Sequence, residues 1–561
     1  MPNPFPSIEI EMVKYGGEDR NPAMQLFGRR FFSDQTVTEL LVELLLVVVS
    51  EKRVRTETFK SALPAFELLC NWPHNERNPS FASSLEYAPK ARLNLKLFSF
   101  LGASKLETRH ETHRNHYVDL LNRMRSATII SGTSDVDDVL KTLENLFLGF
   151  QGVGGQRTWC AQSFLPICGS IVAGESIWKL SEARKIERNE WEEAINYFSH
   201  SQQIFLARGG ELLYLQLCNA IRQNYSQLKN WTDKADIGLN EIEDDPVKLH
   251  EALSHAFSNL MSACPKTIEK LAEFIDSGVD SETSRRTDAN VSGKTRFATC
   301  GWCPEESWQE GYLFAIEILR LCSAQIDPME RFELLELLCA MQVVRSLCAQ
   351  SARYIEWKES QKNIAGPLGY LFAISDPDGN HKALKQISRR SVSSCERMIY
   401  QAIRHPQIKA NVDEQQRLDA AAARPRRRDI YTEADSRYGY KYFLSLCKRI
   451  GMIIPRRGKG ARFVINEKIL RILILTVMRP GQRITYETFK RLAMVHYGMM
   501  FDDKGISLAS EWSGGPTILT LGGNADAWLL EMLDSAGVLI RLSDSCTLVV
   551  NQSDGTEEAE S

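Results

Sequence analysis

The sequence predicts a mainly α-helical protein, with a large multi-helix body followed by two small α+β modules. Through most of residues 1–406, apolar residues recur at helical spacing in segments separated by short polar loops. Residues 434–552 twice combine a helix, a glycine and two short apolar strands. No fixed period of about 30–45 residues is visible, which argues against a regular solenoid.

Length and composition agree with this fold class. The chain has 561 residues, of which 43% are hydrophobic and 25% charged, as in an ordinary globular protein. This length suffices for about three or four domains. We expect helical domains over 1–278 and 298–406, a loop or boundary at 279–297, a basic linker at 407–433, modules at 434–482 and 483–552, and a disordered tail at 553–561.

The N-terminal region predicts a cytoplasmic protein without a membrane segment. The first twenty residues are polar and contain prolines where a signal peptide would be apolar. Residues 33–49 offer Ser33 or Asp34 as a helix cap, followed by a strongly apolar helix or buried strand. The apolar run Leu40–Val49 contains Glu43 and is too short to cross a bilayer. We interpret the 13 scattered cysteines as reduced core residues.

Three stretches before residue 300 resemble functional motifs only superficially. His110, His113 and His116 would lie on a helix, where the outer two diverge by about 120° and cannot share one metal ion. The glycine-rich stretch 146–168 lacks the Lys-Ser/Thr that a phosphate-binding P-loop needs. Gly293-Lys294-Thr295 lacks the first glycine of that motif, so we expect no ATP site. Whether stretch 146–168 serves packing or a partner contact stays open.

Cys300 and Cys303 are the only metal candidates that we retain, and they are weak ones. Their C-x2-C spacing can be part of the core, half of a zinc site or a redox pair. A second ligand pair at zinc-site distance is missing, and so is the βαβ context of a thioredoxin-like motif. We therefore favour packing and expect no metal and no cofactor.

The chain also lacks a recognisable catalytic constellation. No hydrolase, zinc-protease or kinase signature occurs. The acidic clusters at 135–138 and 241–245 have no Lys, His or metal partner at a defined spacing, and are most simply helix-start charges or solvated loops. Strong core helices are expected at 307–325, at 328–354 with Pro328 in the first turn, and at 384–404.

The stretch from Ala434 to Asn466 is the most informative part of the sequence. Its helix places apolar residues on one side and Arg437, Lys441 and Lys448 on the other. Gly451 is a candidate C-cap, and two apolar strands then flank a basic turn. A helix followed by a basic hairpin resembles the recognition helix and wing of a winged-helix domain. This resemblance implies DNA binding, although such domains also serve as protein-docking modules.

Charge is concentrated in the same region. Residues 424–491 contain 18 Lys and Arg against 5 Asp and Glu, whereas residues 502–561 contain 2 against 11, within a chain of net charge −3. Clustering of this kind marks a polyanion partner. The expected phosphate-contacting or base-contacting residues are Arg426, Arg427, Arg428, Arg437, Lys441, Lys448, Arg456, Arg457, Lys459 and Arg462. The arginines at 424–428 could equally belong to a solvated linker.

A second helix followed by a hairpin occurs near the C-terminus. Trp528–Asn551 again reads helix, glycine, strand, turn and strand, with Gly537 matching Gly451 and Asn551 matching Asn466. The helix and turn of this copy carry Glu531, Asp534 and Asp544, so a phosphate-lined groove would repel it. We expect this copy to mediate protein contact or dimerisation.

These observations favour a non-catalytic nucleic-acid-binding or scaffold subunit. Its expected partners are DNA, bound largely through phosphates, and other protein subunits; a homodimer is left open. The overall organisation is similar to accessory proteins of bacterial anti-phage defence operons, including methylation-associated ones, without a diagnostic motif. Two alternatives remain: a transcriptional regulator, and a metal-dependent nuclease with a dispersed active site. If the basic linker separates body and modules, deleting residues 424–561 leaves a soluble helical body.

Overall fold

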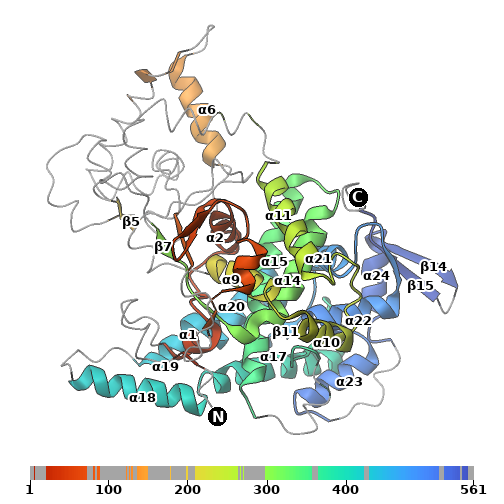
Figure 1. The fold of residues 1–561 in the computed structure, drawn as a ribbon. Helices are drawn as coiled ribbons and strands as arrows, with labels where there is room; N and C mark the ends of the chain where they lie inside the picture. The colour runs from red at the N-terminus through yellow and green to blue at the C-terminus, as the bar shows by residue number, and fades with distance from the viewer. Residues whose placement is uncertain are drawn as a thin grey trace.

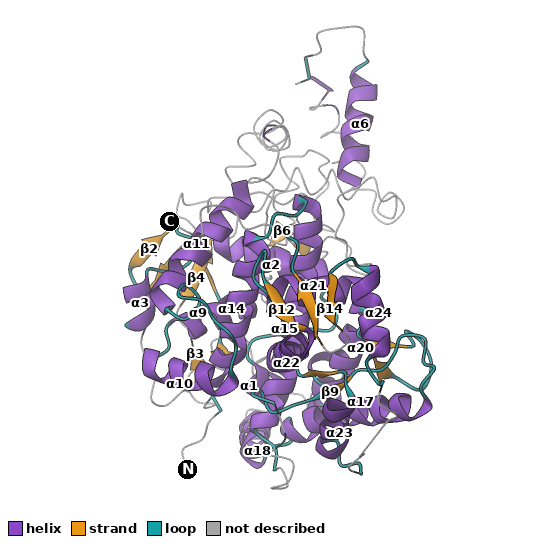
Figure 2. Cartoon of the chain, turned by 90° about the vertical axis from the view of Figure 1, so that its right-hand side faces the viewer, coloured by secondary structure: helices purple, strands orange, loops and turns teal. Residues whose placement is uncertain are grey.

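The computed structural model places most of the residues that it describes in helices, as predicted (Figure 1; Figure 2). The residues that the structure describes are 21–72, 85–88, 135–148, 209–262, 297–356, 366–421, 429–516, 524–543 and 546–553, together with isolated residues and short pieces between these ranges. No helix within these ranges is long and apolar enough to cross a membrane. The mainly α fold class is therefore confirmed for the described part of the chain.

Two long helices form the centre of the body. These are α14 (Trp308–Ser323) and α15 (Pro328–Arg353), which match the predicted pair. Asp327 caps α15, since its side chain accepts the amides of Met329 and Glu330 at 2.8 and 3.3 Å. Helix α9 (Gly209–Ile221) packs along α14, and a side chain at Gly311 would collide with the Gln216 carbonyl of α9. Glycine at this position lets the two helices approach closely.

The apolar N-terminal run is a helix and not a strand. Helix α2 (Val37–Val49) packs on α9 and α15. Its cap is Thr36, whose hydroxyl accepts the Glu39 amide while the Glu39 carboxylate accepts the Thr36 amide. The predicted caps Ser33 and Asp34 are wrong because this reciprocal box lies slightly further along the chain.

Further helices precede or follow these elements between residues 22 and 421. They are α1 (Pro22–Phe27), α3 (Phe66–Cys70), α6 (Val136–Leu148), α10 (Tyr225–Ala235), α11 (Pro246–Ser262), the 3-10 turn η4 (Glu305–Ser307) and α18 (Pro406–Ala421). Helix α18 lies within the expected linker and contacts α1.

Small antiparallel sheets that helical periodicity does not predict also belong to the body. One sheet has the order β2-β1-β4-β7 and is built from β1 (Glu51–Val54), β2 (Glu57–Phe59), β4 (Leu85–Ala88) and β7 (Ala298–Thr299). Two strand pairs are β3 (Ser80–Phe81) with β8 (Cys303–Pro304), and β5 (Ile177–Trp178) with β6 (Phe198–Ser199).

The first C-terminal unit is assembled from segments far apart in sequence. Its elements are β9 (Phe372–Ala373), α17 (Lys382–Ala402), α19 (Ile430–Glu433), the π-turn η5 (Ala434–Tyr438), α20 (Tyr440–Ile450), β10 (Ile453–Ile454) and β11 (Arg462–Phe463). Gly451 adopts φ +84° and ends α20, as predicted. The Ser375 amide donates to the Phe463 carbonyl at 2.9 Å, so the chain just after β9 lies beside β11.

The second unit also ends in a helix followed by a β-hairpin. It contains α21 (Glu467–Val477), β12 (Arg483–Thr485), α22 (Tyr486–Tyr497), β13 (Met499–Met500), α23 (Asp503–Trp512), α24 (Ala527–Ser535), β14 (Leu539–Ser543) and β15 (Cys546–Val550). Its three-stranded sheet has the order β12-β15-β14. Strand β13 pairs in parallel with β9, which joins the two units.

Equivalent hydrogen bonds relate the two hairpins residue by residue. The Val464 amide donates to Met452 O, and the Val550 amide donates to Val538 O, both at 2.9 Å. Met452 and Val538 each follow the glycine that ends the preceding helix, and the strand pairs then run in the same register. Val464 therefore corresponds to Val550, one residue away from the alignment that matches Asn466 with Asn551.

One apolar core runs through the described residues from Phe5 to Val549. Helix α21 packs on α14 and α15, and α20 packs on α15 and α17. The boundaries predicted at 406 and 433 thus lie between elements that share a core.

Candidate nucleic-acid interface

The tip of the β10–β11 hairpin carries the exposed cations that the sequence predicts. Arg456, Arg457 and Lys459 are exposed, and none of them forms an ion pair with a residue that the structure describes. Gly458 and Gly460 have φ values of +95° and +89°, a backbone region in which side chains are strained. The turn therefore presents three solvated charges close together.

The root of this hairpin is held rigidly by the body. Ile453 and Phe463 are fully buried. The Ser388 hydroxyl of α17 accepts the Phe463 amide at 2.8 Å and lies 3.2 Å from the Phe463 carbonyl. Helix α17 thus fixes where the hairpin leaves the core.

Arg462 does not belong to the exposed tip, in contrast to the prediction. Its guanidinium is buried and donates to the Ser375 hydroxyl at 2.7 Å and to the carbonyls of Asp376 and Pro377 at 2.6 and 2.8 Å. Burial lowers the pKa of Arg462, and the neighbouring Arg389 guanidinium lowers it further. Arg462 is committed to the loop before α17 and is removed from the candidate phosphate contacts.

Helix α17 adds basic residues that the sequence reasoning missed. Its exposed positions follow helical spacing along one side: Lys382, Gln386, Arg389, Ser393, Arg397 and Tyr400. Arg389 lies against the hairpin, since a Cβ at Gly460 would be 3.1 Å from its Nη2 atom. Lys385 and Arg462 close over Gly379. The exposed spacing of Lys382, Arg389 and Arg397 was the signal that could have identified this side.

Helices α17 and α20 run antiparallel, so their polar sides form one surface with the hairpin. The rings of Tyr400 and Tyr440 are 6.1 Å apart at one end, and Arg389 meets the hairpin at the other. Lys441 is exposed on α20, as predicted. We call the group formed by Lys385, Arg389, Lys441, Arg456, Arg457 and Lys459 the basic surface.

The remaining predicted cations are less available or lie elsewhere. Lys448 is half-buried beside Glu396 of α17, whose pKa is raised by burial and partly restored by this lysine. Arg437 is exposed, but its guanidinium lies 5.6 Å from the Phe32 ring and its carbonyl accepts the Ser33 amide. Arg426, Arg427 and Arg428 lie outside the described residues.

The hairpin of the second unit does not repeat this chemistry. Glu531 and Asp534 are exposed on α24, and Arg541 of β14 lies 3.6 Å from the Asp534 carboxylate. The described part of this hairpin therefore offers no cluster of cations.

The C-x2-C pair is part of the core. Cys300 and Cys303 are fully buried, and burial raises the pKa of the Cys303 thiol well above its usual range. Among the described residues, no group of three or more His, Cys, Asp and Glu could hold a metal ion. The histidines at 110, 113 and 116 and the glycines at 152–155 lie outside those residues.

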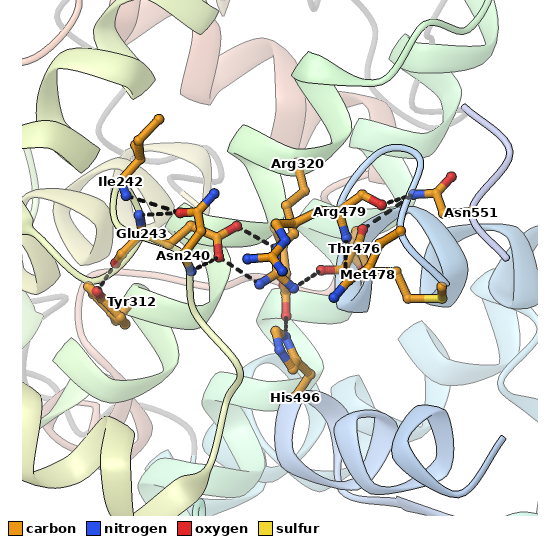
Figure 3. A network of polar contacts seen from close by, with 12 residues as sticks. Asn240, Ile242, Glu243, Tyr312, Arg320, Thr476, Met478, Arg479, His496 and Asn551 are labelled. Atoms are coloured by element: carbon orange, nitrogen blue, oxygen red, sulfur yellow. Dashed lines mark hydrogen bonds and ion pairs between the residues drawn. The ribbon is translucent and has the colours of Figure 1, made fainter. Parts of the chain in front are cut away.

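A buried polar network joins the helical body to the second unit (Figure 3). Arg320 of α14 donates to both carboxylate oxygens of Glu243, at 2.6 and 2.9 Å, and to the Thr476 carbonyl of α21 at 2.9 Å. Burial raises the Glu243 pKa, but Arg320 outweighs it and lowers the pKa overall. All three side chains are almost inaccessible, so this network is structural and cannot reach a substrate.

A second buried pair lies beside it. Arg345 of α15 donates to both oxygens of Glu317 at 2.7 Å and to the His496 carbonyl of α22 at 2.9 Å. The Nδ1 atom of His496 lies 2.7 Å from a Glu317 oxygen. Burial lowers the His496 pKa most strongly; Glu317 opposes this effect, and the Arg320 and Arg345 charges reinforce it. His496 therefore stays neutral at a pH where a free imidazole is protonated.

This histidine makes stability depend on pH. Below about pH 6.5 the unfolded chain binds a proton at His496 that the folded chain rejects, so stability falls as the pH decreases through this range. Replacing His496 by glutamine, which keeps a donor for Glu317, should flatten the dependence below about pH 6.5. Urea unfolding across this range measures the effect, with His255→Gln on an exposed helix position as the control. An unchanged slope in His496→Gln would contradict the assignment.

Comparisons with protein-family models, curated proteins and solved structures give no match to this chain.

Proposed function

We propose that this chain binds duplex DNA through the basic surface, as a non-catalytic subunit of a larger assembly. The observation that carries the proposal is the exposed hairpin tip, where Arg456, Arg457 and Lys459 have no ion-pair partner among the described residues. Each such cation can neutralise one phosphate and release a counterion. Lys385 and Arg389 extend the same charge along α17.

The order of elements supports a finer proposal, that both C-terminal units are winged-helix-like modules. In the second unit, the helices α21, α22 and α24 and the sheet order β12-β15-β14 correspond to the three helices and three strands of that fold. In the first, α15, α17 and α20 would supply the helices, and the chain after β9 the first strand. In this proposal α20 is the recognition helix and the basic hairpin is the wing.

Alanine substitution of Arg456, Arg457 and Lys459 together tests the proposal. Losing three phosphate contacts should weaken duplex binding by roughly 100-fold near 0.1 M salt and reduce the slope of log K against log salt by about 2.7. Fluorescence anisotropy with a labelled duplex at several salt concentrations measures both quantities. The matched control removes three exposed lysines that do not belong to the basic surface, Lys234, Lys248 and Lys266.

Equal losses of affinity in both triple variants would show that binding depends only on net charge and not on the hairpin. Unchanged binding in the hairpin variant would show that the hairpin is not part of the interface. Competition with unrelated duplexes measures sequence preference. A strong preference would favour the alternative function of a transcriptional regulator over that of a subunit that binds largely through phosphates. The resemblance to anti-phage accessory proteins stays a prediction, which neighbouring genes would test.

A further inference from the structure

Among the described residues, β14 forms an open and apolar edge of its sheet. The sheet order β12-β15-β14 leaves β14 at an edge, where the described residues supply no further strand. Ile540 and Leu542 are two residues apart on one side of this strand and are 38% and 61% exposed. Figure 1 shows β14 and β15 projecting away from the helical body. An exposed apolar edge of this kind is a template for pairing with another chain.

The twin hairpin shows how such an edge is closed. Because the two hairpins share a register, Pro455 occupies the position of Arg541, and Arg456 that of Leu542. Proline lacks the amide that would donate to an added strand, and a charge beside it disfavours pairing. The first hairpin therefore carries two protective features at the very positions where the second has a free amide and a leucine.

Backbone direction makes the β14 edge suitable for pairing. Val538 accepts a bond from Val550, so its polar groups face β15, and by alternation those of Leu539 and Arg541 face outward. The ladder with β15 is regular from Leu539 to Arg541 and shifts register before Ser543, so the stretch available for pairing is short. A short ladder predicts an interface that dissociates on dilution.

We propose that the occupant of this edge is β14 of a second copy of the chain, paired antiparallel about a twofold axis at Arg541. Arg541 then exchanges backbone bonds with Arg541 of the second copy. Ile540 of each chain lies opposite Leu542 of the other, so all four apolar side chains gather on one side. Asp534 lies 3.6 Å from Arg541 in the same chain and offsets the repulsion between the two arginines. The edge is thus complementary to itself.

Sedimentation of the full chain over a range of concentrations tests the proposal. We expect a reversible monomer–dimer equilibrium for the unchanged protein. Arg541→Pro copies the first hairpin: it removes only an outward amide, so the β14–β15 bonds are retained. Leu542→Lys places a charge opposite Ile540. Each variant should weaken self-association by at least about tenfold, while Val247→Lys, which charges an exposed apolar position on α11, should leave it unchanged.

Three results would overturn the proposal. The first is a protein that stays monomeric throughout, and the second is a dimer that neither edge variant weakens. The third is a monomer that dimerises only after removal of residues 554–561, which would identify the tail as the occupant. Circular dichroism verifies that Arg541→Pro folds, and Leu542→Lys gives the answer if it does not. The hairpin-tip alanine variant should dimerise normally, so this proposal can fail independently of DNA binding.

Discussion

Replacing Arg345 by methionine should destabilise the protein by about 3–5 kcal/mol, because it leaves the buried Glu317 carboxylate without its main partner. Both side chains are at most 1% exposed, and two hydrogen bonds of 2.7 Å join them. Water cannot replace the guanidinium at this depth. The substitution also removes the donor to the His496 carbonyl, and with it a link between α15 and α22.

Urea unfolding measures this loss, and an exposed ion pair provides the control. Lys468 lies 2.7 Å from Glu333, but their side chains are 69% and 54% exposed. Lys468→Met should therefore cost less than about 1 kcal/mol. A combined Arg345→Met and Glu317→Leu variant should regain part of the lost stability, since no buried charge is then unpaired. If Arg345→Met cost no more than Lys468→Met, the buried pair would not hold these helices together.

Deleting residues 424–561 should cause aggregation and not leave a soluble body. Helix α21 buries Ile469, Leu470, Ile472, Leu473, Ile474, Leu475 and Val477, and it packs on α14 and α15. Each such side chain contributes about 1.5–3 kcal/mol on burial, so together they contribute roughly 10–20 kcal/mol, which is at least comparable to the usual total stability of about 5–15 kcal/mol. The deletion also strips the carbonyl partners of Arg320 and Arg345.

Light scattering and thermal unfolding of the truncated chain test this expectation. A chain ending at residue 553 is the control, because it removes only the acidic tail and keeps β15. If the fragment 1–423 were monodisperse and unfolded cooperatively, the domain boundary that the charge distribution predicts near residue 424 would be correct. The packing of α21 on α14 and α15 argues against such a boundary.

Local chemistry explains which elements the sequence predicts well. Asp327-Pro328 starts α15, and Gly451 ends α20, because capping and the left-handed region depend on neighbouring residues only. The apolar spacing of α20 likewise fixes which of its sides is exposed. Helical periodicity says nothing about strands of two to four residues, so the sheet around β1 and β4 could not be predicted.

The candidate interface was predictable in part for the same reason. A run of basic residues between two apolar strands identifies the hairpin, but not which cation turns inward. Arg462 is buried because the loop at Ser375–Pro377 offers it three acceptors, and that loop is far away in sequence. Arg389 was missed because only the fold brings α17 beside the turn. In both cases the position of the arginine depends on contacts between segments that are far apart in the sequence.

The buried position of Arg462 has a consequence for the entropy of binding. Its three hydrogen bonds anchor one end of the turn, and Ser388 holds the adjoining strand through Phe463. A phosphate that meets Arg456, Arg457 and Lys459 therefore has to order their side chains but not the backbone that carries them. Such preorganisation reduces the loss of conformational freedom that accompanies binding.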